Sequence, residues 1–187
     1  MGKHDDAERL EFATRQAWRD WLAENHAAST GVFVVYFKKS ARRSGPTYDD
    51  LIEEALCFGW IDGTARGVDS DRTSLWFCPR RKGSGWATTN KERVDRLRGA
   101  GLMRPAGEDA IARAQEDGSW TLLDRSEALT LPPELADALA AVAGARDAFD
   151  ALAPSARKQL MYRVDSAKRA DTRRQRAEGI AESVVSP

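Results

Sequence analysis

Two groups of residues in the 187-residue sequence combine side chains that ligand binding or catalysis requires. The first is the stretch ALCFGWIDG (residues 55–63), which holds Cys57, Trp60 and Asp62. A carboxylate beside an indole, just past the end of a helix, can line a ligand-binding cleft, although an Asp-Gly pair is also a common turn. Cys57 lies near the C-terminal end of that predicted helix, where the helix dipole disfavours a thiolate. We therefore do not expect Cys57 to be an activated nucleophile.

The second group lies in the basic, glycine-rich segment PRRKGSGW (residues 79–86). Its candidate binding residues are Arg80, Lys82, Ser84 and Trp86. Glycines and a serine just ahead of a helix can present backbone N–H groups to an anion. The segment is neither a Walker motif nor a dinucleotide-binding fingerprint, and the alternative is a solvated basic loop with Trp86 packed inward.

Both groups flank a predicted β-hairpin, so we expect them to meet in space. Antiparallel strands return to their starting point, which would bring Asp62 and Arg80 together. The leading hypothesis is a cleft in which Trp60 and Trp86 supply contact area, while Asp62 and Arg80 orient a small polar or peptide ligand. The alternative is an enzyme in which Asp62 is the general acid or base and Arg80 or Lys82 stabilises developing negative charge.

A third group of charges marks the C-terminal part of the chain. Residues 154–176 hold eight Arg or Lys against two Asp. Such a run is usually a solvated helix face. The alternatives are contact with an anionic partner or with the acidic helix at residues 48–54, which would make the tail an interaction module. The net charge is zero, with 29 basic and 29 acidic residues, and no motif of a nucleic-acid reader is present, so a nucleic-acid partner is not expected.

The sequence indicates no metal, no other cofactor and no membrane segment. The two cysteines, Cys57 and Cys78, lack CxxC spacing, and the only histidines are His4 and His26, which does not suit a zinc site. No apolar run reaches the ~18 residues of a membrane-spanning helix, and the first residues lack the apolar core of a secretory signal. We therefore expect reduced cysteines and a cytoplasmic location, while the oligomeric state stays open.

The elements that position these residues belong to an α+β fold. Runs of β-branched and aromatic residues predict strands over 32–38, 60–66 and 73–78, which we expect to form a small antiparallel sheet with residues 32–38 as a central strand. Helical periodicity predicts helices at residues 14–25 and 48–57 that pack with this sheet.

The composition then divides the chain into parts. Residues 1–120 are expected to form the α+β core domain, and residues 121–132, with their proline pair, a linker. Residues 133–187 are alanine-rich and free of strand signals, so we predict an all-helical C-terminal subdomain.

Three motifs in this order, EALCFGWIDG, PRRKGSGWATTNKERVDRL and GLMRPAG, resemble the YdeI/OmpD-associated family, also labelled bacteriocin-protection proteins. The segment LAPSARKQLMYRVDSAKRADTRRQR resembles that family's C-terminal helical region, so the resemblance covers nearly the whole chain. It implies a bacterial protein that protects against peptide toxins or other stress, and it supplies no catalytic residues. The family's recurring positions match here at residues 57–63 and at Pro79, Arg80, Lys82, Ser84, Trp86 and Asn90.

Overall fold

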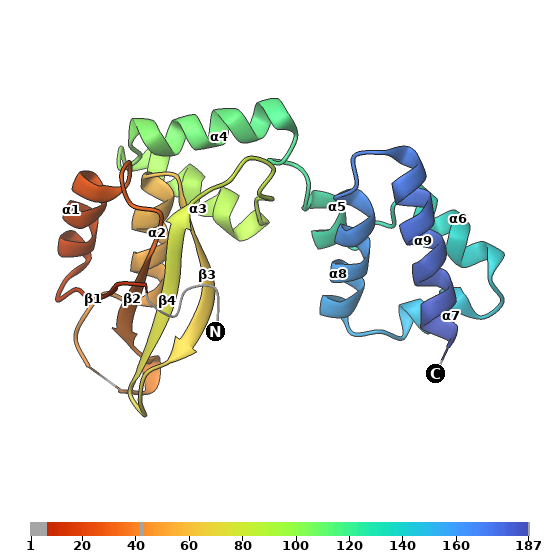
Figure 1. Cartoon of the computed structure of the whole chain (residues 1–187), viewed down its shortest axis with the longest axis horizontal. Helices are drawn as coiled ribbons and strands as arrows, with labels where there is room; N and C mark the ends of the chain where they lie inside the picture. The colour runs from red at the N-terminus through yellow and green to blue at the C-terminus, as the bar shows by residue number, and fades with distance from the viewer. Residues whose placement is uncertain (1–6, 42, 187) are drawn as a thin grey trace. The chain divides into compact units, whose positions relative to one another are not determined.

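The computed structural model describes residues 7–41 and 43–186 (Figure 1). The chain divides into two compact units, the first comprising residues 1–84 and 89–116 and the second residues 85–88 and 117–187. In chain order, the elements up to the end of the first unit are β1 (Arg9–Glu11), α1 (Arg15–Asn25), β2 (Val32–Phe37), the 3-10 helix η1 (Lys39–Ala41), α2 (Tyr48–Cys57), β3 (Trp60–Gly67), β4 (Arg72–Pro79), α3 (Thr88–Gly99) and α4 (Pro105–Asp117).

The first unit contains a four-stranded sheet with the strand order β1-β2-β4-β3. The three predicted strands are present, β2 lies inside the sheet, and β4 pairs antiparallel with both β2 and β3. The predicted α+β class is therefore confirmed. The sheet is mixed rather than purely antiparallel, because β1 pairs parallel with β2. Helix α1 connects these two strands as a crossover, which returns the chain in the same direction, and the three-residue β1 is too short to show a strand pattern.

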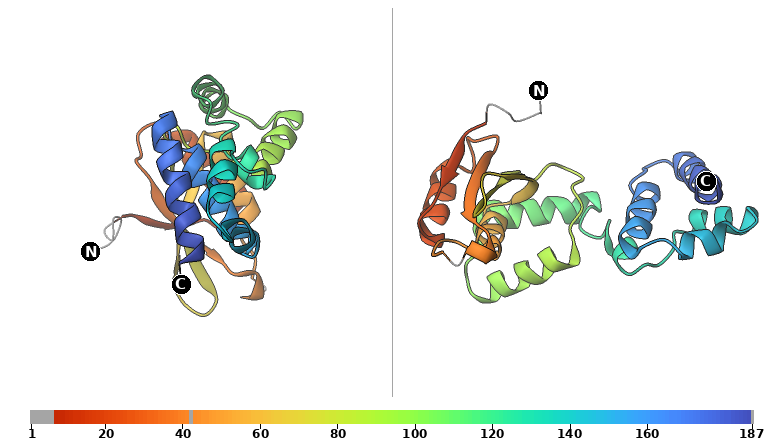
Figure 2. Two further views of the ribbon diagram at one scale, coloured as in Figure 1. Left: turned by 90° about the vertical axis from the view of Figure 1, so that its right-hand side faces the viewer. Right: turned by 90° about the horizontal axis from the view of Figure 1, so that it is seen from below.

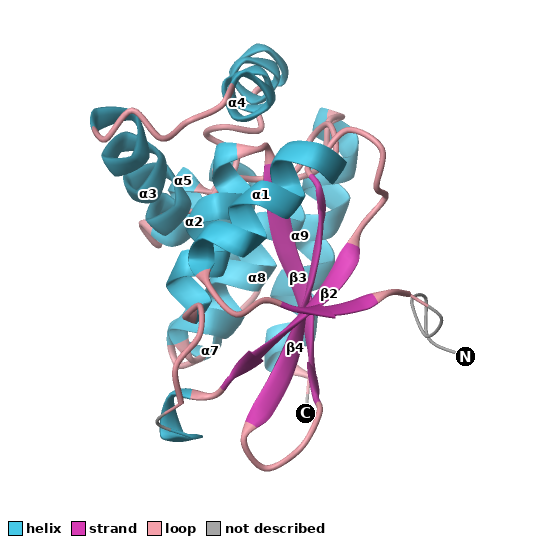
Figure 3. Ribbon diagram, turned by 90° about the vertical axis from the view of Figure 1, so that its left-hand side faces the viewer, coloured by secondary structure: helices cyan, strands magenta, loops and turns pink. Residues whose placement is uncertain are grey.

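Helices α1 and α2 cover one face of the sheet (Figure 3). The ring of Trp18 in α1 lies 5.3 Å from that of Phe77 in β4, and the Trp18 indole N–H donates to the carbonyl of Leu51 in α2 at 3.1 Å. On β3, Trp60 meets Trp21 of α1 edge to face at 5.9 Å. Because side chains alternate along a strand, Asp62, two residues after Trp60, points to this same helix-covered face.

Capping and ion pairs fix where α2 begins and what it packs against. Thr47 and Asp50 form a reciprocal capping box at its N-terminus. Glu54 is buried, and its carboxylate accepts from the Arg15 Nε at 2.5 Å and from the Arg19 guanidinium, both on α1. The other ion pairs of α2 are Asp50–Arg15, Glu53–Arg15, Asp49–Arg93 and Glu53–Arg96. Arginines of α1 and α3 therefore neutralise the acidic helix within the first unit.

Helices are the only regular secondary structure among the described residues of the second unit, and turns and loops connect them (Figures 1 and 2). Its helices are α5 (Asp124–Glu127), which lies inside the predicted linker, α6 (Pro133–Ala141), α7 (Ala145–Asp150), α8 (Pro154–Asp165) and α9 (Ala170–Val185). Helices α6 to α9 enclose a core of Leu135, Ala138, Leu139, Ala145, Phe149, Met161, Val164, Ala177, Ile180 and Ala181. This all-helical part agrees with the alanine-rich sequence, which has little β-branched content to form strands.

Candidate functional site

Asp62 meets two tyrosines on the helix-covered face of the sheet. It is half-buried on β3, and the Tyr48 hydroxyl, at the start of α2, donates to its Oδ2 at 3.4 Å, which is longer than an ordinary O–H···O bond. The ring of Tyr36 on β2 lies 6.4 Å from that of Tyr48. Burial raises the pKa of both phenols, and the negative charge of Asp62 raises it further. Both tyrosines therefore keep their O–H groups at neutral pH.

The hairpin also brings Arg80 toward Asp62. Trp60 pairs with Pro79 in the sheet, and the backbone N–H of Arg80 donates to the carbonyl of Gly59 at 3.0 Å. Burial lowers the pKa of the Arg80 guanidinium to about 10, and the nearby Asp62 carboxylate counteracts that effect. Arg80 is therefore a charged but partly desolvated cation at neutral pH, and the charge of Asp62 favours this charged form.

A cavity of about 440 Å³ opens beside the two tyrosines. It is lined by Tyr36, Phe37, Lys38, Lys39, Arg43, Gly45, Pro46, Thr47, Tyr48 and Asp49. Its volume is in the range of small-molecule sites. Tyr48 thus takes part in two features at once, because it lines the cavity and also donates to Asp62.

The charges around the cavity are unbalanced. Lys38 is hydrogen-bonded within the protein, because its ammonium donates to the backbone carbonyls of Asp69 and Ser70 at 2.9 and 3.1 Å. Asp49 pairs with Arg93 at 2.6 Å. Within residues 7–41 and 43–186, Lys39 and Arg43 form no salt bridge. The cavity therefore combines aromatic surface with two cations that have no carboxylate partner in the described chain.

The other residues expected at the cleft have different surroundings. Trp60 is 1% exposed and its indole N–H donates to the carbonyl of His26 at 3.2 Å, so it belongs to the core. Trp86 is also 1% exposed and packs in the second unit against Trp120, with ring centroids 5.0 Å apart. Ser84 is half-buried, and its backbone N–H donates to the backbone carbonyl of Arg81 at 3.1 Å.

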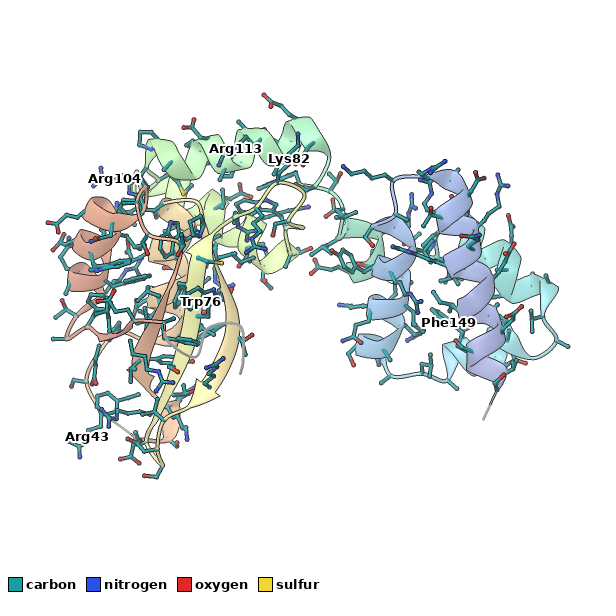
Figure 4. The ribbon with its side chains drawn as sticks, viewed as in Figure 1. Arg43, Trp76, Lys82, Arg104, Arg113 and Phe149 are labelled. Carbon is teal, nitrogen blue, oxygen red and sulfur yellow. The ribbon has the colours of Figure 1, made fainter. Side chains whose placement is uncertain are left out.

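Lys82 is exposed in the loop after β4. Figure 4 shows it at the opposite end of the first unit from Arg43, which lines the cavity. Of the six residues considered from the sequence, Arg80 lies where the charge of the Asp62 carboxylate acts on it.

Sequence reasoning did not find Tyr36, Tyr48, Lys39 or Arg43. In the sequence, Tyr36 is one of several aromatic residues in a predicted strand, and Tyr48 is the first residue of a predicted acidic helix. The strand register and the packing of α2 on the sheet place the two rings side by side. The one available signal is that both tyrosines bracket the segment KKSARRSGPT (residues 38–47), which is strongly basic.

The motif ALCFGWIDG contains Asp62, and it also packs against the start of α4. The backbone N–H of Arg104, just before α4, donates to the carbonyl of Cys57 at 3.1 Å. A Cβ at Gly107 of α4 would lie 2.4 Å from that same carbonyl oxygen. Gly59 has φ = +74°, and a Cβ there would lie 2.7 Å from the carbonyl oxygen of Ala106. The glycines of two separate motifs therefore allow α4 to contact the end of α2 through the backbone.

Cys57 is free, fully buried and, because burial raises the pKa of its thiol, protonated. We expect native protein carrying Cys78→Ser to leave Cys57 unmodified by Ellman's reagent over a period in which the urea-unfolded protein reacts completely. Cys57→Ser should retain ligand binding, because the thiol is 0% exposed. Stoichiometric labelling of the native protein would contradict this assignment.

The described residues contain neither a candidate metal site nor a candidate membrane-spanning helix. There, no three His, Cys, Asp or Glu side chains gather in a way that could hold a metal ion. His26 is half-buried with its Nδ1 2.8 Å from the carbonyl oxygen of Leu22, and His4 lies outside the described residues. No helix among residues 7–41 and 43–186 has the length and apolar character needed to cross a membrane.

The structure thus defines a protein with an α+β unit, a cavity beside a Tyr–Asp–Arg cluster, and a separate helical unit. Residues 10–110 match the family model described as a domain of unknown function (DUF8412). This match covers more than half of the chain, which therefore belongs to the DUF8412 family. Residues 128–185 match the model described as "Bacteriocin-protection, YdeI or OmpD-Associated".

The second match confirms the predicted relation to the YdeI/OmpD-associated family and falls on the helical unit. The motifs at residues 55–63 and 79–86 lie within the part that the first model matches. No curated protein and no solved structure matches the chain significantly.

Proposed function

We propose that this protein acts in bacteriocin protection by binding a small polar ligand in the cavity beside Tyr36 and Tyr48. The match of residues 128–185 supports the protective role. The observation that carries the binding proposal is the cavity of about 440 Å³, lined by two phenols and two cations without carboxylate partners in the described chain. A cytoplasmic location remains part of the proposal, supported by two free cysteines.

The chemistry of the lining specifies the ligand. Lys39 and Arg43 favour an anionic group, because no carboxylate of the described chain neutralises them. The Tyr48 hydroxyl donates to Asp62, so its oxygen is left as an acceptor for a ligand donor. Tyr36 and Tyr48 offer ring surface. A small carboxylate with a hydroxyl or amino group, or the C-terminal end of a peptide, meets all three requirements.

Three probes that share one ring test this proposal: 4-hydroxyphenylacetate, its neutral amide and tyramine. We expect the anion to bind most tightly and tyramine least tightly in calorimetric titration. Arg43→Gln should reduce the preference for the anion. Tyr48→Phe should weaken binding by roughly 2- to 10-fold, the worth of one hydrogen bond. Absence of binding by all three probes, or equal affinity for them, would argue against the site.

Tyr162→Phe is the matched control, because Tyr162 is 39% exposed and Tyr48 is 43% exposed. It should leave probe affinity unchanged. An equal loss in both tyrosine variants would mean that Tyr48 has no special role.

A further inference from the structure

The second unit carries a concentration of positive charge that its ion pairs do not remove. In residues 154–176, the two carboxylates already have arginine partners: Asp165 accepts from Arg125 at 2.9 Å, and Asp171 lies 4.0 Å from Arg174. Two further arginines pair with acids outside this segment, Arg157 with Asp150 at 3.8 Å and Arg173 with Glu134 at 2.7 Å. Within the described chain, the cations left without a salt bridge are Lys158, Arg163, Lys168, Arg169 and Arg176.

These five cations follow one another along α8, the turn after it and α9. Lys158 and Arg163 lie on α8, Lys168 and Arg169 in the turn, and Arg176 on α9. The Arg176 guanidinium donates to the Arg163 carbonyl at 2.6 Å and to the Ser166 hydroxyl at 3.2 Å. Arg176 of α9 therefore lies at the C-terminal end of α8. We call these five residues, together with Tyr162, the α8–α9 cation surface.

Tyr162 gives this surface an aromatic side chain. It lies one helical turn after Lys158, and residues four apart on a helix are neighbours. Its side chain is 39% exposed, although it is one of the large apolar residues. An exposed ring between cations is the combination that single-strand binders use, with bases stacked on the ring and phosphates held by Lys and Arg.

We infer that the α8–α9 cation surface binds single-stranded nucleic acid, with its cations on phosphates and Tyr162 stacked on a base. The zero net charge of the chain does not oppose this, because the acids that balance the sum include those of α2, which are paired with arginines of α1 and α3. The expectation of no nucleic-acid partner rested on that sum and on the absence of a recognised reader motif.

A protein partner fits the surface less well. The centre of a protein interface is apolar and poor in lysine, whereas nucleic-acid interfaces are polar and strongly positive. Among the described residues of the second unit, the exposed large apolar side chains are Tyr162 and Val185. The residues near Tyr162 on α8 include Lys158, Gln159 and Arg163, which are polar and not buried.

Fluorescence anisotropy of the full chain with labelled dT20, rU20 and a 20-base-pair duplex tests the inference. If all five cations contact phosphates, log K should fall with log salt at a slope of about −3.5 for single strands. Lys158→Gln/Arg163→Gln should reduce that slope to about −2.1 and weaken binding about 25-fold at 0.1 M salt. Tyr162→Leu should weaken single-strand binding by roughly 5- to 100-fold, while Tyr162→Phe retains it.

The control is Arg113→Gln/Arg146→Gln, which also removes two positive charges, but at residues outside the α8–α9 cation surface. Arg113 is exposed on α4 (Figure 4), and Arg146 pairs with Asp150 on α7. This variant should bind single strands like the parent protein. Equal losses in the two double variants, duplex binding as tight as single-strand binding, or no anisotropy change at ~100 µM protein in low salt would each overturn the inference. Unchanged circular dichroism would show that the variants remain folded.

Discussion

Glu54→Ala is expected to destabilise the first unit by about 3–5 kcal/mol, the usual cost of removing one partner from a buried ion pair. The Glu54 side chain is 3% exposed, and it pairs with Arg15 and with Arg19, whose side chain is 10% exposed. Without the carboxylate, Arg19 would keep its bond to the Leu102 carbonyl at 2.7 Å but would hold an uncompensated buried charge. Urea unfolding followed by tryptophan fluorescence measures the loss, since Trp18, Trp21, Trp60 and Trp76 lie in this unit.

Two further variants separate burial from charge. Glu108→Ala removes the partner of Arg98, and both side chains are about 40% exposed, 41% and 39%, so its cost should not exceed about 1 kcal/mol. Glu54→Leu/Arg19→Met replaces the buried pair with apolar residues and should recover much of the stability lost in Glu54→Ala. A loss below about 1 kcal/mol in Glu54→Ala would show that water reaches this network.

Gly107→Ala is the second substitution with a large expected effect, a loss of about 1–3 kcal/mol or more from overpacking. The new Cβ would lie 2.4 Å from the Cys57 carbonyl oxygen and 2.8 Å from that of Leu56. Both contacts are with backbone, which cannot rotate away. The substitution should also weaken probe binding at the cavity, because the end of α2 leads into β3 and Asp62.

Gly179→Ala provides the matched control for this prediction. Gly179 lies in α9, and nothing is within 4 Å of the position its Cβ would occupy. Alanine is the better helix former, so this variant should be more stable by about 0.5–1 kcal/mol. If Gly107→Ala were equally stabilising, α4 would not contact the end of α2 as closely as the structure shows.

The local pattern of the sequence was sufficient for three of the four strands and for the hairpin that joins two of them. Strands at residues 32–38, 60–66 and 73–78 were predictable because β-branched and aromatic residues cluster there, and the hairpin between the last two pairs neighbours in sequence. That hairpin alone places Arg80 against Gly59, three residues before Asp62.

Tertiary structure decided which side chains share a site. A strand side chain changes face with every one-residue shift in register, and the register of β3 against β4 shifts between Asp62 and Ala65. The sequence alone also allowed Trp60 to line a cleft, whereas the packing of α1 places it in the core. Tyr48 reaches Asp62 only because Thr47 and the Glu54 ion pairs set where α2 begins and how it packs. These contacts join segments far apart in the chain, and hydrophobic periodicity carries no information about them.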